Sequence, residues 1–240
     1  MRIPRIYIDQ PLGTDCEIEL GTDSVHYLAA VLRMKAGMAL VAFDGSGMEF
    51  HGTLTALDRK SATARFTDAM RPATESPLLT ELGIGISRGE RMDYVVQKST
   101  ELGVRIIQPL FTEHCEVRLD DKRAAKRRDH WQQVAISACE QSGRVVPPKV
   151  LAPLPLAEWL DDVDYPCKFL LDQDQEHKLE EREKPEGVAL LIGPEGGLSD
   201  NEKTLALGKG FSGLNLGART LRTETAPVAA LSLLQYLWGN

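Results

Sequence analysis

The sequence has few features of metal-binding or disulfide-rich proteins. It contains only four cysteines, Cys16, Cys115, Cys139 and Cys167, which lie far apart without a CxxC pair. This spacing argues against a zinc site and against a disulfide scaffold, and it favours buried thiols. The five histidines form neither HxxxH nor HExxH, so we expect no metal centre.

Long apolar runs are also missing. No stretch approaches the roughly 18 apolar residues of a membrane span. The first residues, MRIPRIYID, carry charges and a proline where a signal sequence has an apolar run of about 7 to 15 residues. We therefore expect a cytoplasmic protein without a membrane partner. Hydrophobic residues make up 42% of the 240-residue chain and charged residues 26%, which suits one large globular domain or two modest ones.

The net charge of −7 would suggest no affinity for nucleic acid if the charge were evenly spread, but it is not. Basic residues gather within residues 120–131, DDKRAAKRRDHW: Lys122, Arg123, Lys126, Arg127 and Arg128. An apolar stripe marks the other side of the same predicted helix: Trp131, Val134, Ala135 and Ala138. The basic side therefore points outward, either as a surface for RNA or as a solvated face.

The chain is expected to form two domains. Residues 1–72 contain short apolar alternations, one helical pattern at VHYLAAVLRM and a hairpin turn at DGSG, which predicts a small β-barrel or sheet with one helix. RPATESPLLT, residues 71–80, predicts a linker. In residues 73–240, apolar runs typical of buried strands alternate with helical patterns. This alternation predicts an α/β domain with a parallel sheet covered on both faces.

Two glycine-rich stretches are candidates for a cofactor site. GIGISRG, residues 83–89, places Arg88 where the dinucleotide fingerprint requires its third glycine. LLIGPEGGLSDNE, residues 190–202, predicts a strand, a turn and a helix, but no Lys follows the glycines as a phosphate-binding loop requires. Ser199 and Glu202 predict a capping box, which would leave the helix amides less free for an anion. A neutral or cationic polar ligand is therefore favoured, with a plain tight turn as the alternative.

A second strand-loop-helix opening follows at LNLGARTLRTETAP, residues 214–227, where Arg219, Arg222 and Glu224 crowd the loop. Ligands of parallel sheets bind at the carboxyl ends of the strands, so the two loops are expected to form one pocket. Thr223 or Thr225 can cap the last helix, which is apolar on more than one side. Such a helix is covered either by its own chain or by a second subunit.

Four motifs in this order resemble the RsmE family of SPOUT-class methyltransferases: SRGERMDYVVQKSTELGV, ACEQSGR, LIGPEGGLSDNE and LNLGARTLRTETA. The N-terminal MRIPRIY and HYLAAVLRM are similar to that family's PUA-like RNA-binding barrel. The resemblance implies S-adenosylmethionine-dependent methylation of N3 of uridine 1498 in 16S ribosomal RNA of the small subunit. It also implies a PUA-like domain over residues 1–72, a SPOUT domain with a C-terminal trefoil knot over residues 73–240, and a homodimer packed at the knots.

The resemblance also assigns cofactor contacts to this chain. They are expected at Leu171, Leu191, Ile192, Gly193, Pro194, Glu195, Gly196, Gly197, Leu216, Gly217 and Leu221. Because S-adenosylmethionine carries a sulfonium cation and no phosphate, a turn without Lys is consistent with this cofactor.

Methylation of a uridine nitrogen requires loss of a weakly acidic proton. We expect Arg222 to stabilise negative charge on the uracil oxygens and Glu224 to orient Arg222 or accept the proton. For Glu224, a carboxylate that only favours the helix N-terminus is an equal alternative. Arg88 is expected either to hold the target nucleotide or to form a surface salt bridge.

RNA contacts are expected from the barrel and from the basic helix: Arg2, Arg5, Arg33, Lys35, Lys122, Arg123, Lys126 and Arg127. Two alternative functions stay open. One is the same methyl transfer to another RNA, such as transfer RNA. The other is a non-catalytic RNA-binding protein with the same fold.

Overall fold

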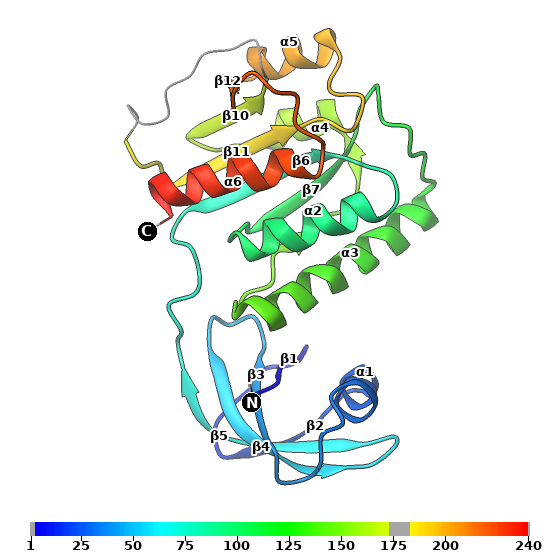
Figure 1. The fold of residues 1–240 in the computed structure, drawn as a ribbon, viewed down its shortest axis with the longest axis vertical. Helices are drawn as coiled ribbons and strands as arrows, with labels where there is room; N and C mark the ends of the chain where they lie inside the picture. The colour runs from blue at the N-terminus through cyan, green and yellow to red at the C-terminus, as the bar shows by residue number, and fades with distance from the viewer. Residues whose placement is uncertain (1–2, 173–182, 240) are drawn as a thin grey trace. The chain divides into compact units, whose positions relative to one another are not determined.

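The computed structural model describes residues 3–172 and 183–239. The chain divides into two compact units (Figure 1). The first comprises Met1–Glu75 with Cys139–Pro147, and the second comprises Ser76–Ala138 with Pro148–Asn240. The boundary drawn from the sequence after residue 72 does not anticipate that Cys139–Pro147 packs with the N-terminal residues.

The first unit is a five-stranded sheet in the order β1-β3-β4-β5-β2. Its strands are β1 (Arg5–Tyr7), β2 (Cys16–Glu19), β3 (Ala39–Phe43), β4 (Glu49–Leu57) and β5 (Ala62–Met70). Neighbouring strands are antiparallel except β1 and β3. The predicted DGSG turn joins β3 to β4, and there the Asp44 carboxylate accepts the Ser46 N–H at 2.9 Å. The predicted helical pattern forms α1 (Thr22–His26) and the π-helical turn η1 (Tyr27–Val31), whose Leu28 is buried in the core of the sheet.

An ion pair holds Cys139–Pro147 within the first unit. The Arg144 guanidinium lies 2.8 Å from Glu75, whose carboxylate also accepts the N–H groups of Val145 and Val146 at 2.9 and 3.0 Å. Burial opposes ionisation of Glu75, but Arg144 and the two amides outweigh it and hold the pKa of this carboxyl below its usual value. Val145 also packs against Phe43 of β3. The N-terminal sheet therefore depends on residues that follow Glu75 by about 70 positions.

The second unit is a seven-stranded parallel sheet in the order β12-β10-β11-β6-β7-β8, with β9 also paired to β7. Its strands are β6 (Leu79–Gly85), β7 (Ile106–Phe111), β8 (Lys149–Val150), β9 (Leu154–Pro155), β10 (Cys167–Leu171), β11 (Gly187–Ile192) and β12 (Ser212–Leu214). The predicted parallel sheet is confirmed. Strands β8 and β9 were not predicted, because two residues are too few to show a period.

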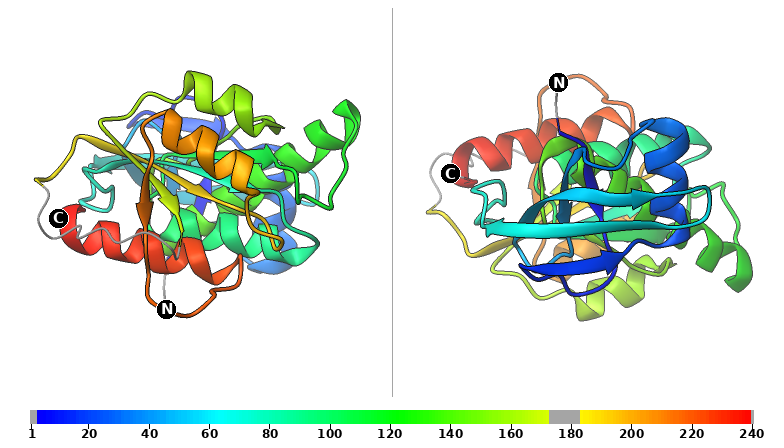
Figure 2. Two further views of the ribbon diagram at one scale, coloured as in Figure 1. Left: turned by 90° about the horizontal axis from the view of Figure 1, so that it is seen from above. Right: turned by 90° about the horizontal axis from the view of Figure 1, so that it is seen from below.

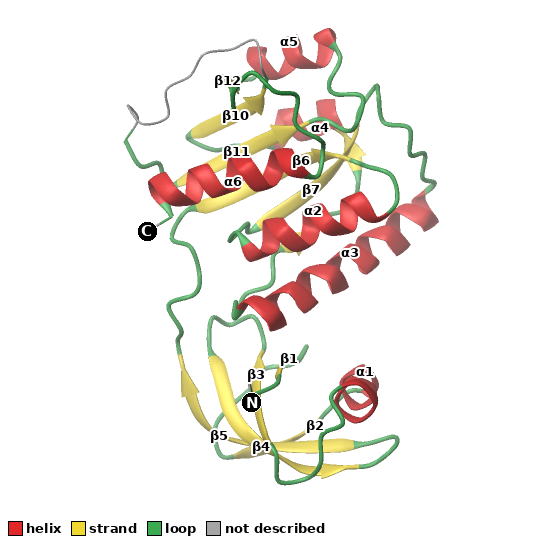
Figure 3. Ribbon diagram, viewed as in Figure 1, coloured by secondary structure: helices red, strands yellow, loops and turns green. Residues whose placement is uncertain are grey.

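Helices cover both faces of this sheet, as predicted. They are α2 (Glu90–Glu101), α3 (Asp121–Ser142), α4 (Leu156–Asp162), α5 (Asp200–Gly208) and α6 (Thr225–Trp238). Figure 2 shows α6 on one face and α4 with α5 on the other, and Figure 3 shows the strands between these layers. Along β11, Leu190 packs with α2 and α6, whereas Leu191 packs with α4 and α5. Successive side chains of a strand point to opposite faces, which explains the alternation.

Candidate functional site

A cavity of about 690 Å³ opens at the carboxyl ends of three neighbouring strands. Its walls are residues 171–172 at the end of β10, residues 192–198 from the end of β11 into the following turn, and most of residues 214–226 from the end of β12 to the start of α6. The structure thus brings the two predicted loops together around one cavity. Every residue predicted to contact a cofactor lines it except Leu191, which is fully buried in the core under α4 and α5.

The turn after β11 forms one wall, and glycine is required around it. Gly197 has a φ of +70°, which side chains other than glycine rarely adopt, and its N–H donates to the Pro194 carbonyl at 2.9 Å. A Cβ on Gly85 at the end of β6 would lie 2.5 Å from the Pro194 nitrogen. Only glycine therefore lets β6 approach the turn this closely.

A neighbouring loop fixes the far end of this turn. The Gly196 carbonyl lies 3.0 Å from Nδ1 of His114, which must donate because a carbonyl only accepts. The Glu202 carboxylate accepts the N–H groups of Ser199 at 2.9 Å and of Glu113 at 2.8 Å. The Ser199 hydroxyl accepts the Glu202 N–H in return, so the predicted capping box is confirmed. One carboxylate thereby caps α5 and ties it to the loop after β7.

Glu195 ties the same turn to the start of α2. Its carboxylate accepts the Arg88 N–H at 3.0 Å and pairs with the Arg91 guanidinium at 2.8 Å. Burial opposes ionisation of Glu195, but these donors outweigh it and lower the pKa of the carboxyl. The Arg88 side chain points elsewhere, to Glu116 at 2.7 Å, and is not among the residues that line the cavity. Arg91 does line the cavity, although no sequence motif identifies it as a site residue.

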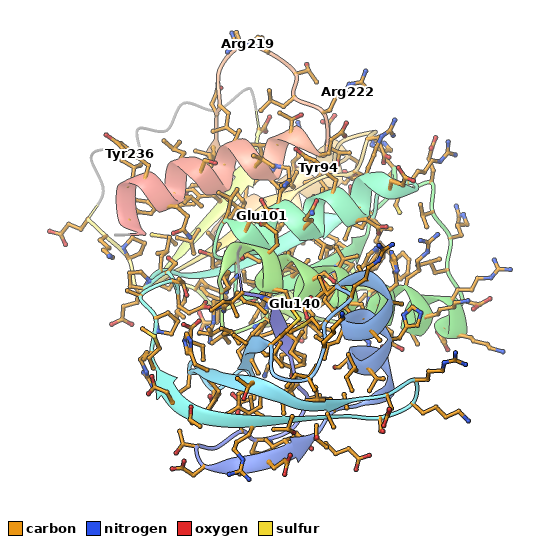
Figure 4. The ribbon with its side chains drawn as sticks, turned by 60° about the horizontal axis from the view of Figure 1, so that its bottom comes forward. Tyr94, Glu101, Glu140, Arg219, Arg222 and Tyr236 are labelled. Carbon is orange, nitrogen blue, oxygen red and sulfur yellow. The ribbon has the colours of Figure 1, made fainter. Side chains whose placement is uncertain are left out.

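The loop before α6 carries the predicted catalytic residues. Arg222 and Glu224 both line the cavity, and Figure 4 shows Arg222 on the loop that leads into α6. The Arg222 side chain is exposed. The Oε2 atom of Glu224 is buried and has no hydrogen-bond partner among the described residues. The cavity therefore contains a cation on a long side chain, Arg222, and a carboxylate oxygen of Glu224 that can accept a hydrogen bond from a ligand.

The prediction that Thr223 or Thr225 caps α6 is wrong. The N-cap residue is Glu224, and no side chain makes a capping hydrogen bond there. The Thr223 hydroxyl instead donates to the Gly193 carbonyl at 3.3 Å and lies 3.1 Å from the Ser87 hydroxyl. The Thr223 hydroxyl thus bonds to the glycine turn after β11 and does not cap α6.

A second charged pair lies on the β10 side of the cavity. The Lys203 ammonium is 3.3 Å from a carboxylate oxygen of Asp172, whose side chain is only 8% exposed. Both residues line the cavity. The sequence pattern did not identify them, because their pairing joins the end of β10 to α5.

The residues predicted to contact RNA differ in their exposure to solvent. Arg2 lies outside the described residues. The Arg5 guanidinium pairs with Glu49 and donates to the carbonyl oxygens of Gly143 at 3.2 Å and Arg144 at 3.4 Å, so it is largely buried inside the first unit. The other predicted contacts are exposed, on the first unit or along α3: Arg33, Lys35, Lys122, Arg123, Lys126 and Arg127. On α3 the four basic side chains are exposed, whereas Trp131 and Ala135 further along the helix are buried.

All four cysteines are free thiols; Cys115 and Cys139 are buried, and Cys16 and Cys167 are half-buried. Among the described residues, no group of three His, Cys, Asp or Glu side chains is placed to hold a metal ion. None of the helices in the described ranges is long and apolar enough to cross a membrane.

Comparisons with known proteins agree with this architecture. A family model described as an RNA methyltransferase domain matches residues 74–235, and one described as an RNA methyltransferase PUA domain matches residues 20–67. The fold and the site are thus those of an RNA methyltransferase with an N-terminal PUA-like domain.

Individual relatives narrow this class. The ribosomal RNA small subunit methyltransferase E of Buchnera aphidicola is 36% identical, with 100% of this chain and 98% of the relative covered. A crystal structure of the Neisseria gonorrhoeae enzyme of the same name, bound to S-adenosylmethionine, is 39% identical with a TM-score of 0.93 and 99% of each chain covered. A Legionella pneumophila methyltransferase structure with bound cofactor SAM is 38% identical, with a TM-score of 0.96 and 100% of each chain covered. The chain belongs to the ribosomal RNA small subunit methyltransferase E family, the RsmE family that its motifs resemble.

Proposed function

We propose that this protein transfers the methyl group of S-adenosylmethionine to N3 of uridine 1498 in 16S ribosomal RNA of the small subunit. The observation that carries the proposal is the cavity between the two glycine-rich loops, at the carboxyl ends of β10, β11 and β12. Family membership supports the reaction, and the two related structures with bound S-adenosylmethionine support the donor.

The residues of the cavity fit this donor. Its volume of about 690 Å³ lies within the range of small-molecule sites, roughly 300 to 1,000 Å³. Leu171, Leu216 and Leu221 supply apolar surface for an adenine ring, and the glycine turn offers backbone groups for its polar edges. The methionine end of the donor carries both an ammonium and a carboxylate. Asp172 and Lys203 would hold these two groups, since each presents the opposite charge.

The bound donor would supply an electrophilic methyl group on a sulfonium, and the protein must then align the acceptor and remove its proton. Glu224 suits the second task, because its buried Oε2 has no donor among the described residues and would gain one from the uridine N3–H. This observation favours proton acceptance over orientation of Arg222. Arg222, exposed beside it, would stabilise the negative charge that spreads to the uracil oxygens.

Arg88 would hold the target nucleotide from outside the cavity. Its pair with Glu116 is well exposed, with side-chain exposures of 63% and 58%. Exposed pairs of this kind contribute at most about 1 kcal/mol, so an RNA phosphate can displace Glu116 at little cost. The Arg88 N–H stays bonded to Glu195 and keeps the backbone of this loop in place.

The two units would divide the work. We assign a PUA-like RNA-binding domain to residues 1–72, and donor binding, catalysis and further RNA contacts to residues 73–240. Phosphate contacts would come from the exposed basic side of α3 and from the barrel: Lys122, Arg123, Lys126, Arg127, Arg33 and Lys35. Arg5 would support the barrel rather than contact RNA directly, because its guanidinium is engaged by Glu49. We also propose a cytoplasmic location, because a ribosomal RNA substrate would be found there.

The resemblance also leads us to propose a trefoil knot around the cavity and a homodimer. Helices α2 and α6 contact each other and display Tyr94 and Tyr236, which are 45% and 80% exposed (Figure 4). Exposed aromatic side chains are typical of protein interfaces. Sedimentation of Tyr236→Glu tests this surface: a shift from dimer to monomer is expected, and an unchanged dimer would exclude Tyr236 from the interface.

Mass mapping of modified nucleosides tests the reaction. Unmodified small-subunit RNA, incubated with the purified protein and S-adenosylmethionine, should gain 3-methyluridine at one site. Methyl transfer to transfer RNA instead would support the first alternative function. Calorimetry that detects no binding of S-adenosylmethionine would support the non-catalytic alternative.

A matched pair of variants tests the roles at the loop. Arg222→Ala should lower the turnover number at saturating RNA and donor by about 10²-fold or more, the loss typical of removing a group that stabilises an oxyanion. Glu224→Gln should retain donor affinity and lower the turnover number, because a neutral amide cannot accept the N3 proton. Near-normal turnover of Arg222→Ala would show that Arg222 has another role.

A further inference from the structure

Two buried hydroxyl groups meet at the wall of the cavity and take no part in the chemistry proposed above. Ser87 follows β6 and is 3% exposed, and Thr223 lies between Arg222 and Glu224 and is 7% exposed. Their oxygens are 3.1 Å apart, and the Thr223 hydroxyl is also 3.3 Å from the Gly193 carbonyl. Three loops that are distant in the sequence therefore converge on the Thr223 side chain.

The direction of these hydrogen bonds follows from the groups involved. A carbonyl oxygen only accepts, so Thr223 donates its single hydroxyl hydrogen to Gly193. Ser87 must then donate to Thr223. This hydroxyl bridge, Ser87 to Thr223 to Gly193, links the loop before α2, the loop before α6 and the glycine turn after β11.

The bridge complements the way in which α6 holds the same loop. The Arg222 carbonyl accepts the N–H groups of Thr225 and Ala226, both at 2.9 Å, which forms the first turn of α6. Ala226 is buried in the core of the second unit, so the helix fixes one side of this backbone. On the other side, the Thr223 hydroxyl joins this backbone to the Gly193 carbonyl. A threonine at the start of a helix ordinarily uses its hydroxyl for a local cap, and here the hydroxyl crosses to the glycine turn instead.

We propose that Thr223 is a positioning residue. Its hydroxyl fixes the backbone that carries Arg222 and Glu224 against the glycine turn, so that the groups acting on the acceptor keep their place relative to the bound donor. This inference rests on the proposed function, since it assumes that Arg222 and Glu224 act on the acceptor. Neither Thr223 nor Ser87 needs to touch a reacting atom.

The kinetic consequence should appear in the chemical step. A displacement of about 1 Å can cost on the order of 10²-fold in rate when reacting groups must be aligned. We expect Thr223→Val, which keeps the volume but removes the hydroxyl, to slow single-turnover methyl transfer at saturating RNA and donor by 10-fold or more. The affinity for S-adenosylmethionine, measured by calorimetry, should change less than 3-fold, because the glycine turn retains its own contacts.

Three further variants separate the hydroxyl from its surroundings. Thr223→Ser keeps the hydroxyl and should restore the rate to within 3-fold of the wild type. Ser87→Ala removes only the donor to Thr223 and should give an intermediate loss. Thr225→Val makes the same chemical change two residues away on an exposed side chain that does not line the cavity, and it should behave as the wild type. A rate for Thr223→Val within 2-fold of the wild type, or equal losses for Thr223→Ser and Thr223→Val, would overturn the proposal.

Amide hydrogen exchange of the ligand-free protein supplies a readout that does not depend on activity. In Thr223→Val, the amides of Thr225 and Ala226 should exchange at least 10-fold faster than in Thr223→Ser, while that of Leu231, deeper in α6, should not change. Equal exchange in both variants would show that the hydroxyl does not hold this turn. If the wild-type protein transferred no methyl group to any RNA, the proposed function would fail, whereas the exchange comparison would still decide whether the bridge fixes the loop.

Discussion

The carboxylate of Glu202 makes two hydrogen bonds whose loss can be calculated and measured. It accepts the N–H of Ser199 at 2.9 Å and the N–H of Glu113 at 2.8 Å, so Glu202→Ala removes both. A hydrogen bond to a charged group contributes roughly 1.5 to 3 kcal/mol, and partial exposure of Glu202 favours the lower end, because water replaces some of what is lost. Two such bonds at about 1.5 kcal/mol each predict that Glu202→Ala lowers the free energy of unfolding by about 3 kcal/mol.

Urea unfolding followed by circular dichroism measures this loss, and a fall in Tm of roughly 6 to 12 °C should accompany it. Glu202→Gln keeps an acceptor oxygen but no charge, so it should lose about half as much. Glu158→Ala is the matched control, since it removes a first-turn carboxylate from α4, where the side chain is exposed, and should cost at most about 1 kcal/mol. A loss for Glu202→Ala no larger than that of the control would refute the idea that this carboxylate ties the two loops together.

Three further predictions follow from the contacts around the cavity and on α3. The depressed pKa of Glu195 means that its stabilisation is complete above its usual value of 4.5 and is lost as pH falls through the lower value in the folded protein. The Tm values of wild type and Glu195→Gln should therefore differ near neutral pH and converge in acid, and a constant difference would contradict this. Gly85→Ala should lower the free energy of unfolding by roughly 1 to 3 kcal/mol in the same urea assay, because its Cβ would overlap Pro194, and unchanged stability would show that β6 can move away. Neutralising Arg123, Lys126 and Arg127 together should reduce the slope of log affinity for RNA against log salt by about 2 to 3, and an unchanged slope would remove α3 from the interface.

Local sequence signals identified those features in which neighbours in the chain are also neighbours in space. The capping box needs only Ser199 and Glu202, three positions apart, and it is present as expected. The alternation of apolar runs and helical patterns likewise predicted the parallel sheet. A second alternation acts within each strand, where successive side chains point to opposite faces of the sheet. Leu191 therefore faces the side opposite to Leu190 and Ile192, which explains why Ile192 lines the cavity and Leu191 does not.

Features that depend on distant residues could not be found this way. Arg91 lies at the cavity because Glu195, 104 positions later, holds it there. The Thr223 hydroxyl has a local capping role available, and only the folded chain shows that it bonds to Gly193 instead. Arg5 has the charge of an RNA contact, but folding buries it against Glu49. In each case the side chain could serve several purposes, and its neighbour in space decides which.

The pairing of Arg144 with Glu75 has a consequence for any attempt to separate the two units. A fragment that ends at Glu75 would lack Arg144 and Val145, leaving the Glu75 carboxylate without its cation and Phe43 without part of its cover. The missing segment, Cys139–Pro147, begins in the last turn of the long helix α3. The N-terminal unit is therefore built from two separate segments of the sequence, and it is complete only after more than half of the polypeptide has been synthesised. A barrel transferred to another protein would have to include Cys139–Pro147.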